Sequence, residues 1–169
     1  MLTADEVIRM LDLKVHPIEG GFFRETQRST GLLPGGTHPD YAADRSLGTS
    51  IYFLLTANTV SEMHRLPGDE IFHFYVGDPL EMLQLHPGGV SRVVILGTDL
   101  RAEQEPQITV PGGVWQGSRR LAGMHGYTLL GCTMAPGFDY ADYVRGKRDE
   151  LTAGWPGNAE LLTALTPKG

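Results

Sequence analysis

Short runs of alternating hydrophobic and polar residues, separated by glycine and proline, dominate the middle of the chain. Such alternation is typical of β-strands with one buried face, and frequent turn residues between strands are typical of a sandwich or barrel. The pattern predicts a mainly β protein with strands at residues 22–28, 47–55, 70–76, 80–85, 91–96, 106–110 and 126–134.

Helices are expected only at the two ends of the chain. Near the N-terminus, Thr3 and Glu6 have the spacing of a capping box, and Val7 begins an apolar stripe. Near the C-terminus, a short helix is expected after Pro156, with Asn158 as its N-cap. Residues 29–46 carry no regular pattern, so we expect a long loop there.

The overall composition indicates one domain and argues against two classes of partner. A chain of 169 residues, of which 41% are hydrophobic and 20% charged, is long enough to bury a sizeable core, so we expect a single domain over residues 1–169. A net charge of -6 with no basic run argues against nucleic acid, and no apolar run reaches the roughly 20 residues that cross a membrane. The single Cys132 cannot form an intrachain disulfide, which fits the reducing cytoplasm.

Two groups of residues have the spacing of the metal-binding motifs of cupin β-barrels. The first motif of that type carries two histidines and a glutamate, and here His64, Leu66 and Glu70 occupy those three positions. The second motif carries a histidine, and here Gln116 occupies its position after Pro111. The spacing of the motifs is retained, but two of the four ligands are replaced.

Several further blocks of sequence resemble one cupin family in particular. The segments GGFFRET, TSIYFLL, DEIFHFYVGDPLEMLQL, VPGGVWQG and GCTMAPGFDYADY look like the blocks of the cupin-5 family, a domain of unknown function, and the resemblance spans residues 15–155. It implies a double-stranded β-helix, the cupin jelly-roll barrel, usually assembled as a homodimer. Proteins related in shape include deoxysugar epimerases and phosphomannose isomerases, but the resemblance brings no established reaction with it.

The replaced ligands argue against a tightly bound metal ion. Transition-metal sites normally use three or more His, Cys or carboxylate ligands, whereas Leu66 offers none and Gln116 offers only a neutral amide. We therefore expect no metal ligands and no cofactor. His64 and Glu70 are then expected to form a hydrogen-bonded pair in a pocket. The alternative is a weak metal site that water or substrate completes.

The candidate catalytic residues are His64, Glu70 and His73. Alternation along residues 70–76 places Glu70 and His73 on opposite faces of their strand, so His73 is either an acid or base or a packed or interface residue. Other polar side chains are candidates for substrate binding, through a guanidinium that clamps an anion and through hydroxyl and amide groups: Arg24, Thr26, Ser50, Tyr52, Gln116 and Tyr127.

Three functions remain open. The first is a small-molecule-binding enzyme, a metal-independent epimerase or isomerase of a sugar-like or acidic metabolite, in which one group removes a proton next to a carbonyl and another returns it. The second is a cupin that binds a small molecule without turning it over, which the loss of the metal ligands favours. The third, a metal-dependent oxygenase, is disfavoured by that same loss. We expect a homodimer with a small-molecule ligand.

Overall fold

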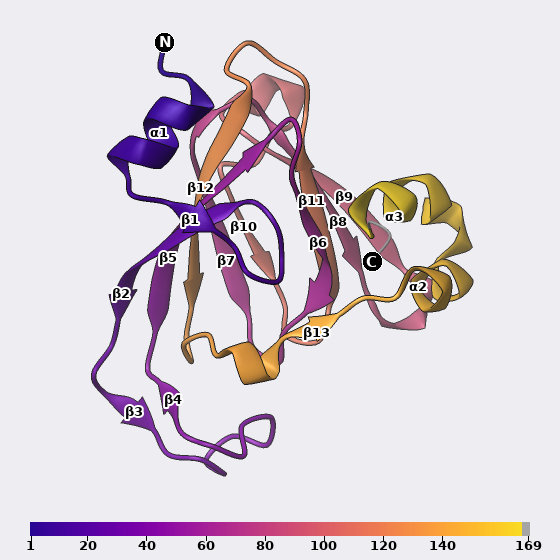
Figure 1. Cartoon of the computed structure of the whole chain (residues 1–169). Helices are drawn as coiled ribbons and strands as arrows, with labels where there is room; N and C mark the ends of the chain where they lie inside the picture. The colour runs from indigo at the N-terminus through magenta and orange to yellow at the C-terminus, as the bar shows by residue number, and fades with distance from the viewer. Residues whose placement is uncertain (167–169) are drawn as a thin grey trace.

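The computed structural model of the protein describes residues 1–166 and contains two antiparallel β-sheets packed face to face (Figure 1). The six-stranded sheet has the order β1 (Lys14–Val15), β2 (Phe22–Arg28), β5 (Thr49–Thr56), β12 (Tyr127–Met134), β7 (Glu70–Gly77) and β10 (Gln107–Val110). The five-stranded sheet has the order β13 (Val144–Arg145), β6 (Val60–Arg65), β11 (Trp115–Arg120), β8 (Leu80–Leu85) and β9 (Ser91–Leu96).

Strands that are distant in the sequence lie side by side in both sheets. β12 lies between β5 and β7, and β11 lies between β6 and β8. The inner faces of the two sheets enclose an apolar core that includes Phe53, Phe72, Leu80, Met82, Leu96 and Leu130. The expected fold, a mainly β cupin barrel of the double-stranded β-helix type, is confirmed, although neither sheet closes on itself within the described residues.

Two central strands, β6 and β11, are absent from the sequence-based prediction. Their inner-facing residues are polar and buried: Ser61, His64, Gln116 and Ser118. A strand whose buried face is polar lacks the hydrophobic alternation on which strand prediction depends. The segment predicted as a long loop, residues 29–46, also contains a short hairpin in which β3 (Leu32–Leu33) pairs with β4 (Arg45–Ser46).

The N-terminal helix α1 (Ala4–Met10) begins with the expected capping box. The Thr3 hydroxyl accepts from the Glu6 backbone N–H at 3.3 Å, and the Glu6 carboxylate accepts from the Thr3 N–H at 2.8 Å, so two otherwise unpaired donors are satisfied. Val7 is buried with Leu54 and Leu129, and these contacts hold α1 against the outer face of the six-stranded sheet (Figure 1).

The C-terminal helices α2 (Arg148–Gly154) and α3 (Ala159–Leu165) cover the outer face of the five-stranded sheet (Figure 1). Leu162 and Leu165 are fully buried there, whereas the Asn158 side chain, expected as the N-cap, makes no capping hydrogen bond. Four short 3-10 helices complete the described secondary structure: η1 (Pro87–Gly89), η2 (Leu100–Ala102), η3 (Tyr140–Asp142) and η4 (Pro156–Asn158). No helix within residues 1–166 is long and apolar enough to cross a membrane.

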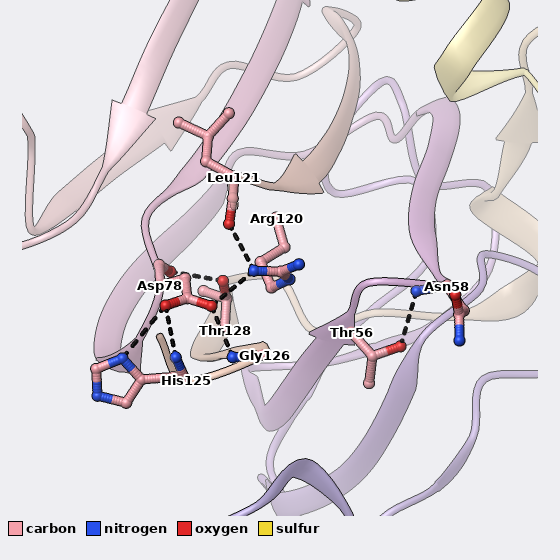
Figure 2. A network of polar contacts seen from close by, with 8 residues as sticks. All are labelled: Thr56, Asn58, Asp78, Arg120, Leu121, His125, Gly126 and Thr128. Carbon is pink, nitrogen blue, oxygen red and sulfur yellow. Dashed lines mark hydrogen bonds and ion pairs between the residues drawn. The ribbon is translucent and has the colours of Figure 1, made fainter. Parts of the chain in front are cut away.

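A buried carboxylate, Asp78, joins the turn after β7 to the turn before β12 (Figure 2). It accepts from the backbone N–H groups of His125 at 2.9 Å and Gly126 at 2.8 Å, and from the Arg120 guanidinium at 2.7 Å. The Thr128 hydroxyl donates to the backbone carbonyl of Asp78 at 2.6 Å. Burial by itself would raise the pKa of Asp78, but the donated hydrogen bonds outweigh it and lower the pKa.

Asp78→Ala should therefore cost about 3 kcal/mol of stability at pH 7, because it leaves buried donors and the Arg120 charge without a partner. A lowered pKa in the folded state gives stability that is lost as the pH falls, so the cost should shrink below about pH 4. Urea unfolding at pH 7 and below about pH 4 measures the free energy of unfolding of both proteins.

The matched control is Asp99→Ala, which removes an exposed cap of η2 and should cost only about 1 kcal/mol. Equal costs for the two variants would contradict a structural role for the Asp78 network.

Candidate functional site

A cavity of about 60 Å³ lies between the two sheets. Its rim carries residues with exposed side chains, Arg28 and Tyr140, and its inner wall carries Glu70 and Cys132. The complete lining is His16, Glu19, Phe23, Glu25, Arg28, Thr49, Ile51, Leu66, Glu70, Cys132, Met134, Phe138 and Tyr140. This volume holds a few water molecules or a ligand fragment of a few heavy atoms.

Glu70, the first residue of β7, contributes a buried carboxylate to this cavity. Alternation along β7 puts it on the same face as Phe72, which belongs to the core. The Gln116 amide donates to one Glu70 carboxylate oxygen at 2.6 Å. Burial raises the pKa of Glu70 to about 7, and the negative charge of Glu19 adds to this effect, whereas His64 and Gln116 oppose it.

Glu19, in the segment between β1 and β2, contributes a second carboxylate. The Ser61 hydroxyl donates to one of its carboxylate oxygens, and its backbone carbonyl accepts from the Glu62 N–H at 2.9 Å. Burial, which the Ser61 hydrogen bond opposes and the Glu62 charge assists, raises the pKa of Glu19 to about 7. Gly20 follows at φ +96°, where an added Cβ would lie 2.4 Å from the Val60 carbonyl oxygen, so the close approach of this segment requires glycine.

Two buried histidines flank the carboxylates in opposite tautomers. The His16 Nδ1 accepts from the Glu19 N–H at 2.9 Å, so its Nε2 carries the proton and faces a Glu19 carboxylate oxygen at 4.0 Å. The His64 Nδ1 donates to the Glu62 carbonyl at 2.7 Å, which leaves its Nε2 as a buried acceptor without a protein partner. The expected hydrogen bond between His64 and Glu70 is therefore wrong, because Glu70 bonds to Gln116 instead. Burial lowers the pKa of His16 to about 4 and also lowers the pKa of His64, so both imidazoles are neutral at pH 7.

The residues at the cupin metal positions do not fit a metal ion. His64, Glu70 and Gln116 do converge on the inner side of the barrel, but Leu66 lines the cavity with a purely apolar side chain. Within residues 1–166, no group of three or more His, Cys, Asp or Glu side chains has an arrangement that holds a metal ion.

Three of the predicted site residues lie on the outer face of the six-stranded sheet, away from Glu70. Arg24, Tyr52 and His73 occupy one row across the paired strands, with Gly131 between the last two. The Arg24 guanidinium lies 5.5 Å from the centre of the Tyr52 ring, and the His73 Nε2 lies 3.0 Å from the Thr133 hydroxyl. The structure therefore separates this row from the cavity by the thickness of the sheet.

The remaining predicted residues also lie outside the cavity lining. Ser50 is on the same outer face as Thr133, with which it pairs, and the Thr26 hydroxyl donates to the Ser50 carbonyl at 3.0 Å. Tyr127 is buried beneath α1 with Val7. These positions leave His64, Glu70 and Gln116 as the predicted residues that the structure brings together.

Sequence reasoning missed Glu19, His16 and Arg28, which the fold brings to the cavity. The one local signal was the adjacent Gly20-Gly21 pair, both at positive φ, which marks a close approach of the chain to another segment. Nothing local shows that the approached segment is β6, because Glu19 and Ser61 are 42 positions apart.

Glu70→Gln should raise stability in alkaline but not in acidic solution. The unfolded carboxyl loses its proton near pH 4.5 and the folded one near pH 7, so wild-type stability falls as the pH rises through this window. At pH 8 the variant should be more stable by roughly 3 kcal/mol, and at pH 5 the difference should fall below about 1 kcal/mol. Denaturant unfolding at the two pH values checks this.

The control is Glu160→Gln, since Glu160 is exposed on α3 and its replacement should change nothing at either pH. A stability difference for Glu70→Gln that is the same at pH 5 and pH 8 would contradict the raised pKa.

Replacing Leu66 and Gln116 together by histidine should create a metal site. The double variant would carry three histidines and Glu70 at positions with cupin spacing, so zinc or nickel should raise its melting temperature. The melting temperature of the wild type should not respond to EDTA. Stoichiometric metal in purified wild type, lost on His64→Ala, would overturn this prediction.

Comparisons with known proteins place the chain in a family. The model of the Cupin superfamily (DUF985) matches residues 5–145. An uncharacterized protein of Saccharomyces cerevisiae is 30% identical over an alignment 145 residues long that covers 79% of this chain and 71% of that protein.

Solved structures agree with this assignment. A hypothetical protein from Leishmania major aligns over 99% of this chain and all of its own, with a TM-score of 0.88 and 31% identity. A protein from Shewanella oneidensis aligns over both full chains with a TM-score of 0.86 and 35% identity. Oxalate decarboxylase from Bacillus subtilis shares only the fold, with a TM-score of 0.55 and 14% identity over 94% of this chain and 38% of that one. With its two-sheet barrel and the match of the family model over most of its length, the chain belongs to the DUF985 family of the cupin superfamily.

Proposed function

We propose that this protein is a metal-independent isomerase or epimerase that binds a small polar metabolite in the cavity between the sheets. The observation that carries the proposal is the pair of carboxylates, Glu19 and Glu70, on one cavity with pKa values of about 7. Perturbed carboxylates in a cleft are typical of acid–base sites. Neither has an Arg or Lys partner within residues 1–166 that would explain it as a structural ion pair.

The two carboxyl groups can supply both proton transfers of such a reaction. Isomerisation next to a carbonyl needs one group that removes a proton from carbon and one that returns a proton to the resulting enediolate. A carboxyl group with a pKa near 7 is populated in both its acid and its base form at neutral pH. The proposal assigns the base to Glu70, which lies at the inner wall, and the acid to Glu19.

The lining favours a neutral sugar-like or a cationic compound over an acidic one. Three carboxylates line the cavity, from Glu19, Glu25 and Glu70, against one guanidinium. That guanidinium, Arg28, is already bound by Glu25 at 3.0 and 2.7 Å. An anionic ligand would meet repulsion from the carboxylates without a free cation to offset it.

Ligand binding without turnover is the second candidate. The small volume of the cavity favours it, because a molecule held in about 60 Å³ has little room to change shape. The arrangement of polar groups serves binding and catalysis equally well, so a measurement of turnover separates the two.

We also propose a homodimer in the cytoplasm. Exposed apolar side chains on α1 and at the end of β7, Met10 and Val76, support a covered outer face, and the free thiol of Cys132 supports a reducing compartment. Light scattering should give about twice the 18.5 kDa mass of the chain. A measured mass equal to that of one chain at micromolar concentration would contradict the proposed dimer.

Catalysis should appear as deuterium incorporation from solvent. A proton that leaves carbon and returns from a carboxyl group exchanges with water, so the enzyme should label its substrate in a metabolite mixture incubated in heavy water. Mass spectrometry reads the added mass. Glu70→Gln and Glu19→Gln should each lower the labelling rate by about 100-fold or more.

Glu160→Gln, an exposed replacement of the same kind, should leave the labelling rate unchanged. A compound that is retained by the protein without labelling would support the binding function, and labelling that survives both cavity variants would exclude these two residues.

A further inference from the structure

We infer that the ligand of this cavity carries a protonated amine, which lies between the carboxylates of Glu19 and Glu70. The inference rests on the proposed function in placing the ligand in the cavity, and it goes beyond it by naming the group that the cavity recognises. Charge, hydrogen-bonding capacity and the aromatic lining each support it.

The charges around the cavity favour a cation. Glu25 and Arg28 neutralise one another at the rim, since two hydrogen bonds join them. Glu19 and Glu70 remain, and within the described residues neither is paired with an Arg or Lys side chain. Buried carboxylates without a cationic partner are costly, and a ligand cation would remove that cost.

Two of the unsatisfied polar atoms near Glu70 are acceptors. The His64 Nε2 and the Gln116 Oε1 have no hydrogen-bond partner, and their side chains are 1% and 2% exposed. Both residues lie on the inner face of the five-stranded sheet, opposite one another on β6 and β11, and Gln116 is bonded directly to Glu70. Neither atom belongs to the cavity lining itself, but Glu70 does and is bonded to Gln116, so this end of the cavity is rich in acceptors. A ligand group that donates hydrogen bonds suits it, and an ammonium has three donors and no acceptor.

Aromatic rings complete the lining. Phe23, Phe138 and Tyr140 face the cavity, with the Phe138 and Tyr140 ring centres 5.0 Å apart. The His16 ring, 4.6 Å from Phe23, closes the same wall. Rings around a cation attract it through their negative faces, and the combination of rings with carboxylates is the usual environment for a bound amine.

The size of the cavity limits the part of the ligand that enters. About 60 Å³ holds an aminomethyl or aminoethyl group, and a larger ligand would continue past the rim at Tyr140. A neutral alcohol would supply hydrogen-bond donors but no positive charge. A carboxylate would supply neither donors nor positive charge.

Binding of an ammonium should release protons from the protein. In the free protein the carboxyl pair retains protons at neutral pH because burial raises both pKa values to about 7. One positive charge is balanced by one carboxylate, so binding should displace one proton from the pair. It should therefore tighten as the pH rises and weaken by about tenfold for each pH unit below 7.

The test is isothermal titration calorimetry of the whole protein with three probes of similar size, namely ethylammonium, ethylene glycol and acetate. Titration at pH 7 in two buffers with different ionisation enthalpies measures proton release. Ethylammonium should bind at least about tenfold more tightly than the other two probes, and its binding should release protons. Glu19→Gln and Glu70→Gln should each weaken its binding by at least about tenfold, while Glu160→Gln should not.

The outcomes separate this inference from the proposed function. If ethylene glycol or acetate bound as tightly as ethylammonium, and the Glu70→Gln variant lost that binding, the preference for an amine would be wrong. The cavity would remain the binding site. Ethylammonium binding that is unchanged in both cavity variants would overturn the amine and the site together. Absence of heat with ethylammonium would overturn the amine, and the deuterium labelling would still decide the function of the cavity. Melting curves of the two variants verify that they are folded.

Discussion

The double pairing of β12 is the constraint on which the rest of the molecule depends. All eight of its residues pair with β5 on one side, and nearly all pair with β7 on the other. Because side chains alternate along a strand, this register decides for three strands at once which residues face the other sheet. A slip by one residue would turn Glu70 and Cys132 outward and bring His73 inward. The Asp78 network fixes the turn before β12 and thereby its register (Figure 2).

The interior that this register creates is apolar in one half and polar in the other. Phe53, Phe72 and Leu130 fill the first half, where their burial stabilises the fold. In the second half, Glu70 and His64 are buried, Glu19 is nearly so, and the His64 Nε2 has no hydrogen-bond partner. The free energy of burying two carboxylates is reduced by protonation, and this is why their pKa values rise. The same cost makes the polar half suited to a ligand that supplies the missing charge and donors.

The replacement of cupin metal ligands is consistent with this distribution of charge. Leu66 stands at a ligand position of the cupin motif and has no polar side-chain atom. Gln116 stands at another and donates a hydrogen bond to Glu70. Glu19 arrives from outside the cupin motifs and adds a second carboxylate to the one that the motif retains. The cavity therefore carries a pair of carboxyl groups where the cupin motif would place one.

The sequence by itself determined the class of fold, the capping box of α1 and the strands whose buried faces are apolar, because these depend on periodicity and on contacts within a few residues. It also placed Glu70 and His73 on opposite faces of β7, and it singled out His64, Glu70 and Gln116 through their spacing. Only the tertiary structure decided that β6 and β11 are central strands, since their buried polar residues resemble those of a solvent-exposed segment. Only the tertiary structure brought Glu19 and His16 to Glu70. Residues that are 42 or more positions apart meet through sheet pairing and layer packing, and neither leaves a local pattern in the chain.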